Sequence, residues 1–451
     1  MTTPSYPFGW PAMSQVRGGA SASDAWNVNF NNGNVNNNNR NNHGCALAVR
    51  RAGECQGATA GVPLDSLYHA WRRARRQKVP SHNQLRFDAR WARGLLQLQR
   101  EIETGTWAPR RSTCFIATRP KAREIHAPDF ADRVVHHWLI PQLEAIYEPG
   151  FIHDSYANRS GRGSHAAVRR LQAFVRQIDS GQPDGWYLQL DIRNFFNSIH
   201  RPTLWAMLKR RLQRSGAAAE VLHVTHALLK RDPLYAGVDV RATTAELAQV
   251  PAHKRLANAP AGRGLPIGNL SSQFFANVYL DALDQYVKHT LRARRYLRYV
   301  DDFVLVHHDR TQLKRWQAEI TAFLRDKLRL DLKDDIRLRR LRDGIDFLGY
   351  IVRPTHTLVR PRVVAHMHEA LTAWGATHVR GQRIRATPDA LRRVQATAAS
   401  YAGHLRHANS TRLTASLRRR YPWLAAATKA NPKPRRHSRR FIEIKFHERQ
   451  A

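Results

Sequence analysis

Two apolar runs with strand character end in acidic residues. Residues 296–306 (YLRYVDDFVLV) predict a strand, a two-residue turn and a second strand, with Asp301 and Asp302 at the tip. Residues 186–196 (WYLQLDIRNFF) predict another strand, which leads to Asp191. Elsewhere apolar side chains recur every three or four residues, as in amphipathic helices. The predicted helices lie at 64–71, 85–98, 216–230, 270–287 and 391–405.

The acidic tip predicts a metal site. Adjacent aspartates repel each other and are costly unless positive charge lies between them. Mg²⁺ would supply that charge, because it takes oxygen ligands and leaves positions open for substrate phosphates. Asp191 is the candidate third carboxylate that would bridge two such ions. The alternative is an ordinary solvated hairpin turn, since Asp-Asp pairs are common.

The charge balance indicates a polyanionic partner. The chain has 451 residues, 42% of them hydrophobic, with 73 Lys and Arg against 35 Asp and Glu, a net charge of +38. Repulsion among so many positive charges destabilises a compact chain unless a polyanion binds to its surface. Nucleic acid is therefore the expected partner. A membrane is not expected, because no apolar run approaches the roughly 20 residues of a spanning helix.

Cysteine usage and the N-terminus indicate the cytoplasm. Cys45, Cys55 and Cys114 show no CxxC spacing, which argues against a disulfide framework and against a zinc finger. The N-terminus lacks the basic, apolar and small-residue pattern of a secretory signal. We therefore expect a cytoplasmic protein.

Residues 1–60 differ in composition from the rest of the chain. Eleven of the sixteen residues from Asn27 to Asn42 are asparagine, a poor former of helices and strands. We predict a disordered low-complexity leader. Asparagine codons begin with two adenines, and replacing those adenines never creates a stop codon. DNA of this kind tolerates mutation directed at adenine.

Three ordered blocks carry a family resemblance. Tyr299-Val-Asp-Asp302, the Asp191 strand before it, and Gly264-Leu-Pro-Ile-Gly-Asn-Leu-Ser-Ser-Gln273 between them resemble the signature of reverse transcriptases. Further similarity runs from Lys121 to Ser410. The resemblance implies an α+β, right-hand polymerase fold with fingers, a palm built on an antiparallel sheet, and a helical thumb. It also implies RNA-directed DNA polymerase activity.

The resemblance implies five segments along the chain. They are the leader (1–60, which is read as possible template-repeat DNA in frame with the enzyme), N-terminal helices and fingers (61–185), the palm with the catalytic aspartates (186–355), the helical thumb (356–430) and a basic tail (431–451).

The resemblance also assigns roles to the acidic residues. Asp191 and Asp301 would hold two Mg²⁺ ions, for which Mn²⁺ substitutes, with Asp302 assisting and the main chain of Ile192 as a further ligand. Lys333 lies near the position of a lysine that the family often carries, but its alignment gives it no assigned role.

Other roles concern the substrates. Lys121 and Arg123, on a predicted fingers hairpin, would bind the incoming triphosphate, and Phe196 would exclude ribonucleotides. The expected nucleic-acid contacts are Arg159, Arg162 and Tyr299.

One block indicates the subclass. Many reverse transcriptases have glutamine before Gly268 and proline after the serines, whereas this chain has Ile267 and Gln273, as in diversity-generating retroelements. An aliphatic side chain removes polar readout near the nucleotide, which predicts low fidelity. The resemblance implies that the enzyme misincorporates nucleotides opposite template adenines during mutagenic retrohoming.

The implied partners are template RNA, the RNA/cDNA duplex, dNTPs and an accessory variability protein in a bacterial or phage setting. Two alternatives stay open. The chain is a retron, group II intron-like or phage-defence reverse transcriptase, or it is a non-catalytic RNA-binding protein on a polymerase scaffold.

Overall fold

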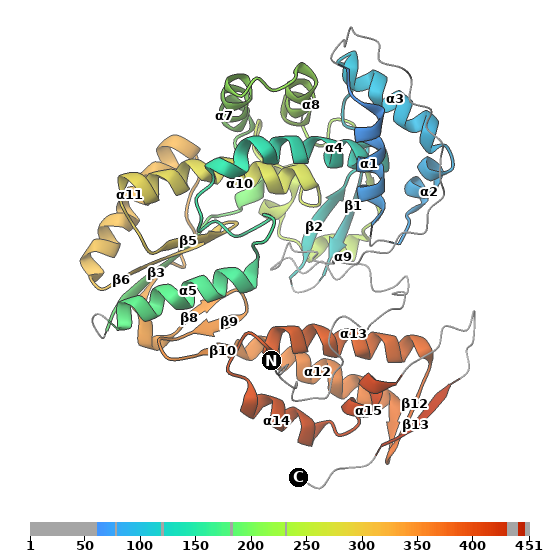
Figure 1. Cartoon of the computed structure of the whole chain (residues 1–451), viewed down its shortest axis with the longest axis vertical. Helices are drawn as coiled ribbons and strands as arrows, with labels where there is room; N and C mark the ends of the chain where they lie inside the picture. The colour runs from blue at the N-terminus through green and yellow to red at the C-terminus, as the bar shows by residue number, and fades with distance from the viewer. Residues whose placement is uncertain are drawn as a thin grey trace, which may run out of the picture. The chain divides into compact units, whose positions relative to one another are not determined.

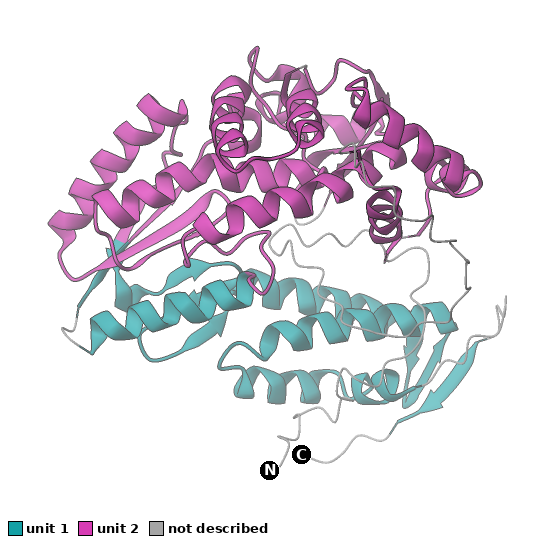
Figure 2. Cartoon of the chain, turned by 45° about the horizontal axis from the view of Figure 1, so that its top comes forward, with its two compact units in different colours: residues 1–32, 164–187, 339–451 teal, residues 33–163, 188–338 magenta. Residues whose placement is uncertain are grey.

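The computed structural model describes residues 61–76, 79–118, 121–180, 184–230, 232–430 and 441–446. The predicted leader and most of the predicted basic tail lie outside the described residues. The chain divides into two compact units, coloured in Figure 2. Among the described residues, unit 2 holds those up to Gly163 and Leu188–Leu338, whereas unit 1 holds Ser164–Tyr187 and those from Arg339 onward.

Unit 2 contains two sheets and most of the helices (Figure 1). Its elements are α1 (Leu64–Arg75), α2 (His82–Asp88), α3 (Trp91–Glu103), β1 (Ser112–Ala117), β2 (Arg123–Ala127), α4 (Phe130–Tyr147), α6 (Phe195–Ser198), α7 (Arg201–Arg214), α8 (Ala219–Lys230), β4 (Val238–Val240), α9 (Thr244–Ala248), α10 (Leu270–Gln285), β5 (Tyr296–Tyr299), β6 (Asp302–His307) and α11 (Arg310–Leu328). Strands β3 (Trp186–Asp191) and β7 (Arg337–Arg340) run across the boundary between the two units.

The first helices follow the predicted periodicity with one difference. Residues 85–98 form parts of two helices, α2 and α3, because the backbone of Arg90 leaves the helical region. The break allows Trp91, the first residue of α3, to stack on Trp71 of α1 with ring centroids 5.1 Å apart. Stacked aromatic side chains bury a large apolar area, which favours two helices over one.

The small sheet of unit 2 has the order β2-β1-β4. β1 and β2 form an antiparallel hairpin, as predicted for the residues around Arg123. β4 pairs with β1 in parallel, Ser112 opposite Val238, although more than a hundred residues separate them. The sequence does not predict that pairing, because the pattern after the helix expected at 216–230 indicates no strand.

The four-stranded sheet has the order β5-β6-β3-β7. β5 and β6 pair antiparallel, and the interior positions of β3, β5 and β6 are buried. α11 packs on β6, and α10, which is buried over most of its length, contacts α4, α7 and α11 (Figure 1). This sheet brings the end of β3 next to the start of β6.

Unit 1 has its own apolar core. Its elements are α5 (Ser164–Asp179), β8 (Ile345–Phe347), β9 (Tyr350–Val352), β10 (Thr357–Val359), α12 (Pro361–His378), β11 (Val379–Arg380), β12 (Arg383–Ala386), α13 (Pro388–Leu405), α14 (Thr411–Arg420), α15 (Leu424–Lys429) and β13 (Ile442–Lys445). The predicted helix at 391–405 is α13. Strand β13, which lies inside the segment predicted as a basic tail, pairs with β12.

The mixture of helices and sheets, whose hairpins are antiparallel, confirms the predicted α+β class. No described helix is long and apolar enough to cross a membrane.

Candidate active site

The turn that carries the aspartates is displaced by one residue from the prediction. Tyr299 pairs with Asp302, so the two turn residues are Val300 and Asp301, and Asp302 begins β6. Val300 has φ +56°, in the left-handed region that a β-branched residue rarely adopts. Such strain persists only where the surroundings hold it in place.

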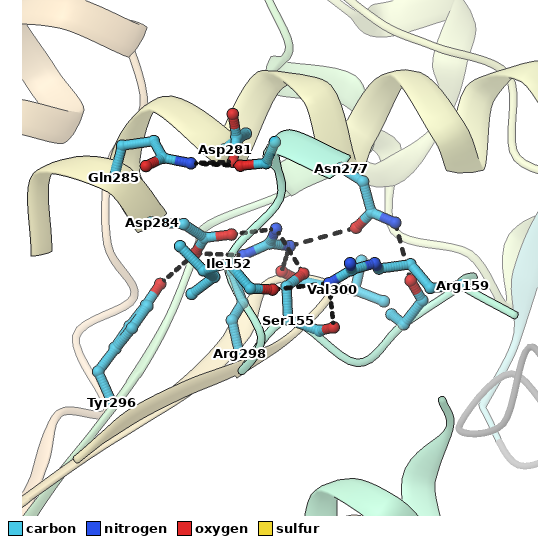
Figure 3. Close-up of polar contacts among 12 residues, drawn as sticks. Ile152, Ser155, Arg159, Asn277, Asp281, Asp284, Gln285, Tyr296, Arg298 and Val300 are labelled. Atoms are coloured by element: carbon cyan, nitrogen blue, oxygen red, sulfur yellow. Dashed lines mark hydrogen bonds and ion pairs between the residues drawn. The ribbon is translucent and has the colours of Figure 1, made fainter. Parts of the chain in front are cut away.

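A buried arginine is hydrogen-bonded to the turn (Figure 3). Arg298 of β5 is 1% exposed and pairs with Asp284 of α10 at 2.7 Å. The same guanidinium donates to the carbonyl of Val300 at 2.9 Å and to Ser155 Oγ at 3.1 Å. Burial alone would lower the pKa of Arg298, but the charge and hydrogen bonds of Asp284 outweigh burial and raise it. A permanent cation therefore ties the turn to α10.

β3 brings Asp191 to the same place. Burial, followed by the negative charge of Asp191, raises the pKa of Asp301 to about 7. Burial also raises the pKa of Asp302 to about 7, with smaller contributions from Asp191 and Asp301. The three carboxyl groups thus repel one another at one end of the sheet, as expected from the sequence.

The residues present fit a divalent cation. One oxygen of Asp191, Oδ1, is buried and has no hydrogen-bond partner among the described residues. The other, Oδ2, pairs with the ammonium of Lys333. In the described part of the chain the oxygens of the three aspartates do not all lie within 4.8 Å of one another. Sharing a cation would draw them closer, since it removes their repulsion.

Ile192 has a main-chain carbonyl whose direction suits a metal ligand. Lys333 N–H donates to the carbonyl of Asp191 at 2.8 Å, and Arg193 N–H donates to that of Asp331 at 2.8 Å. These bonds flank the antiparallel bridge between Ile192 and Leu332. In such a pattern the carbonyl of Ile192 points away from that segment. The carbonyl of Ile192 therefore takes no part in the pairing with Leu332, as is required of a carbonyl that binds a metal ion.

Sequence reasoning missed two residues of this site. Lys333 was left without a role, yet it contacts Asp191, and its charge opposes the pKa rise of Asp301. Gln189 donates from Nε2 to Asp302 Oδ1 at 3.0 Å. A signal for Gln189 existed, because residues two apart on a strand share a face and Asp191 was already identified. The sequence contained no such signal for Lys333, because its contact with Asp191 joins residues 142 positions apart.

The hairpin β1–β2 brings a further cation to the aspartates. Arg123, the first residue of β2, lowers the pKa of Asp301 through its charge. Lys121 is exposed just before β2. A positive charge facing the acidic turn is the arrangement that binding of a triphosphate between them requires.

The loop that carries Ile267 is hydrogen-bonded to the segment of Phe196 and to strand β2. Leu265 N–H donates to the carbonyl of Phe196 at 2.9 Å, and His126 N–H donates to that of Ile267 at 2.7 Å. Ile267, Gln273 and Phe196 are half-buried. Gly268 has φ +120°, and a Cβ there would lie 2.9 Å from His126 O. The close approach for which glycine is needed is thus to strand β2.

Two of the predicted nucleic-acid contacts, Arg159 and Tyr299, are buried in the fold. The guanidinium of Arg159 is buried, pairs with Glu148 at 2.9 Å, and donates to the carbonyls of Ile152 and Ser155. The N–H groups of Arg159 therefore stabilise the fold, because a phosphate could bind them only by replacing these hydrogen bonds. Tyr299 is 5% exposed and offers little ring surface. Arg162, which is half-buried over the ring of Tyr156, stays a prediction.

Comparison with known proteins identifies the family. The sequence profile described as "Reverse transcriptase (RNA-dependent DNA polymerase)" matches residues 116–352, more than half of the chain. The chain therefore belongs to the reverse transcriptase family and is an RNA-directed DNA polymerase. Enzymes of this family copy RNA templates using dNTPs and divalent metal ions.

Individual relatives are distant. YkfC of Escherichia coli is 25% identical over 320 residues, which cover 63% of this chain and 76% of that protein. The group II intron-encoded protein LtrA of Lactococcus lactis is 24% identical over 189 residues, 41% of this chain and 27% of LtrA. Among solved structures, a telomerase from Candida tropicalis with a fragment of telomeric RNA has a TM-score of 0.41 at 9% identity, covering 72% of this chain and 60% of that one.

Proposed function

We propose that this reverse transcriptase serves a diversity-generating retroelement, copying a template RNA into cDNA with frequent errors at template adenines for mutagenic retrohoming. The observation that carries the proposal is the pair Ile267 and Gln273, which stand where many reverse transcriptases have glutamine and proline. The Asn-rich segment 27–42 supports it, since its codons tolerate adenine mutation. An accessory variability protein and the template RNA are the proposed partners, in a bacterial or phage-infected cytoplasm.

The proposed catalytic residues are Asp191, Asp301 and Asp302. Together with the carbonyl of Ile192 they would hold two Mg²⁺ ions. When bound, these ions would lower the pKa of the primer hydroxyl and neutralise the charge of the leaving pyrophosphate. Arg123 and Lys121 orient the triphosphate from the β2 side, and Phe196 excludes a 2′-hydroxyl. Lys333, which pairs with Asp191, balances the negative charge of the site before substrate enters.

The error-prone character follows from the chemistry of Ile267. Its carbonyl is fixed by His126, so the side chain is held at a defined place beside the nucleotide. An aliphatic group there offers no hydrogen bond to the templating base or the incoming nucleotide. Selectivity that rests on hydrogen bonds is stronger than selectivity that rests on apolar shape, so its loss lowers discrimination.

The test is primer extension on a defined RNA with each dNTP alone. Wild type is expected to misincorporate opposite adenine more often than opposite the other bases. Ile267→Gln is expected to reduce that misincorporation about five- to tenfold, the effect of one hydrogen bond of about 1–1.5 kcal/mol. Leu85→Gln, a substitution at an exposed apolar side chain, is the control and should change nothing. An error rate that is equal at all four template bases would contradict the proposal.

The second candidate is a group II intron-like reverse transcriptase, which the similarity to LtrA favours. An intron-type enzyme would copy its template accurately, and Ile267→Gln would leave its errors unchanged. The same assay therefore separates the two functions.

A further inference from the structure

Three side chains with metal-binding atoms, distinct from the three aspartates, converge on the hairpin β1–β2. They are Cys114 on β1, and Glu124 and His126 on β2. Cys114 pairs directly with His126 in the strand register, and Glu124 lies two residues from His126, so all three share one face. Their sulfur, oxygen and nitrogen atoms all lie within 4.8 Å of one another.

The cluster is buried. Cys114 is 2% exposed and His126 is 4% exposed, while the side chain of Glu124 is 10% exposed. Neither ring nitrogen of His126 has a hydrogen-bond partner among the described residues. Buried polar atoms without partners are rare, because each costs about 1–3 kcal/mol. The two ring nitrogens of His126 are therefore available to a ligand, with the carboxylate of Glu124 beside Nε2.

The distances within the cluster are close to those between the ligands of one ion. His126 Nε2 lies 3.3 Å from Glu124 Oε2, and the thiol of Cys114 donates a long hydrogen bond to Glu124 Oε1 at 3.9 Å. Tetrahedral Zn²⁺, with bonds of about 2.0–2.3 Å, separates such ligands by about 3.3–3.6 Å. Small side-chain shifts would bring all three atoms to these spacings.

We propose that Cys114, Glu124 and His126 form a zinc site that fastens the β1–β2 hairpin. A thiolate, a carboxylate and a neutral imidazole balance the charge of Zn²⁺ and are its usual donor types. Metal binding releases the thiol proton to solvent, and water completes the fourth position. Glu124 is already oriented by the N–H of Leu256, which donates to Oε2 at 2.6 Å.

The site would stiffen the part of the hairpin that faces the polymerase centre. His126 N–H holds the carbonyl of Ile267, and Arg123 directly precedes Glu124. An ion that joins β1 to β2 therefore fixes the strand on which both depend. The site does not require the retroelement assignment, since it rests on the hairpin alone.

The test uses the full chain, stripped with a chelator and then titrated with Co²⁺ as a spectroscopic substitute for Zn²⁺. We expect a thiolate-to-cobalt charge-transfer band that saturates at one ion per chain and disappears when Zn²⁺ is added. Cys114→Ser should abolish the band and weaken Zn²⁺ binding at least about 100-fold, more than loss of an outer-shell partner costs. The double variant Cys45→Ser/Cys55→Ser is the matched control and should keep the band.

Two further variants separate this site from the others. Glu124→Gln keeps the side-chain shape and should weaken Zn²⁺ binding, whereas Asp301→Asn should leave the band unchanged. Zn²⁺ should raise the melting temperature of wild type but not that of Cys114→Ser, while Mg²⁺ should not reproduce this difference. Absence of the band in folded wild type, or its persistence in Cys114→Ser, would overturn the proposal.

Discussion

Arg298 is the residue that explains how a strained aspartate turn is maintained. Its guanidinium contacts Asp284, Val300 and Ser155 while 1% exposed (Figure 3). Attraction within a buried pair repays desolvation only when hydrogen bonds are complete, and this pair has several. The geometry of the turn therefore depends on a charge that the sequence pattern alone did not single out.

Removal of that charge should be costly. Arg298→Leu leaves Asp284 buried and unpaired, which should lower the free energy of unfolding by about 3–5 kcal/mol. Arg325→Leu is the matched control, since Arg325 and Asp326 form an exposed pair, 66% and 54% accessible, worth at most about 1 kcal/mol. Urea unfolding measures both variants. Equal losses would contradict the role of the buried pair.

The aspartates themselves predict a pH dependence. In the metal-free protein the pKa of Asp301 and that of Asp302 are raised to about 7, so the folded state binds more protons than the unfolded state between about pH 4 and 7. The free energy of unfolding should then fall as pH rises through this window, by at most about 1.4 kcal/mol per pH unit for each carboxyl.

Thermal unfolding with and without Mg²⁺ checks this prediction. In a chelator, Asp301→Asn should lose less stability than wild type between pH 5 and 8. Mg²⁺ should stabilise wild type at pH 8 and do so weakly at pH 5, where protons compete for the carboxylates. The same variant should abolish primer extension. A wild type whose stability rises with pH in the chelator would contradict the predicted repulsion.

At the scale of elements, the positions of helices were easier to predict than the pairings of strands. Helical periodicity is local, and it located α1, α10 and α13. β4 joins β1 across more than a hundred residues, and β13 joins β12 from beyond the predicted thumb. Such pairings depend on residues far apart in the chain, which a local pattern cannot report.

The loop after Gly264 yields a prediction at this scale. Gly268→Ala introduces a Cβ 2.9 Å from His126 O at φ +120°, which should cost about 1–3 kcal/mol. Because the loop precedes α10 and contacts β2, the KM for dNTP should also rise. Gly403→Ala, in helix α13 with open space around it, should be neutral or slightly stabilising. Identical effects of both substitutions on KM would contradict the assignment.

At the scale of the whole molecule, the net charge of +38 governs association with RNA. Each phosphate contact adds about 0.7 to 0.9 to the slope of log affinity against log salt. With six or more contacts, affinity for a primed RNA should fall about 10³-fold between 50 and 200 mM KCl. Filter binding at a series of salt concentrations measures the slope. A flat dependence would show that the basic surface does not meet the nucleic acid.

The sequence by itself determined the family, and it predicted the three aspartates and the roles of Ile267 and Gln273, because these are properties of short ordered motifs. It also determined the polyanionic partner, since net charge needs no fold. Only the tertiary structure joined Lys333 to Asp191, placed Arg298 under the turn, and gathered Cys114, Glu124 and His126 on one face. The reason is physical: strand register and sheet order decide which distant side chains meet, and both are settled by packing of the folded chain.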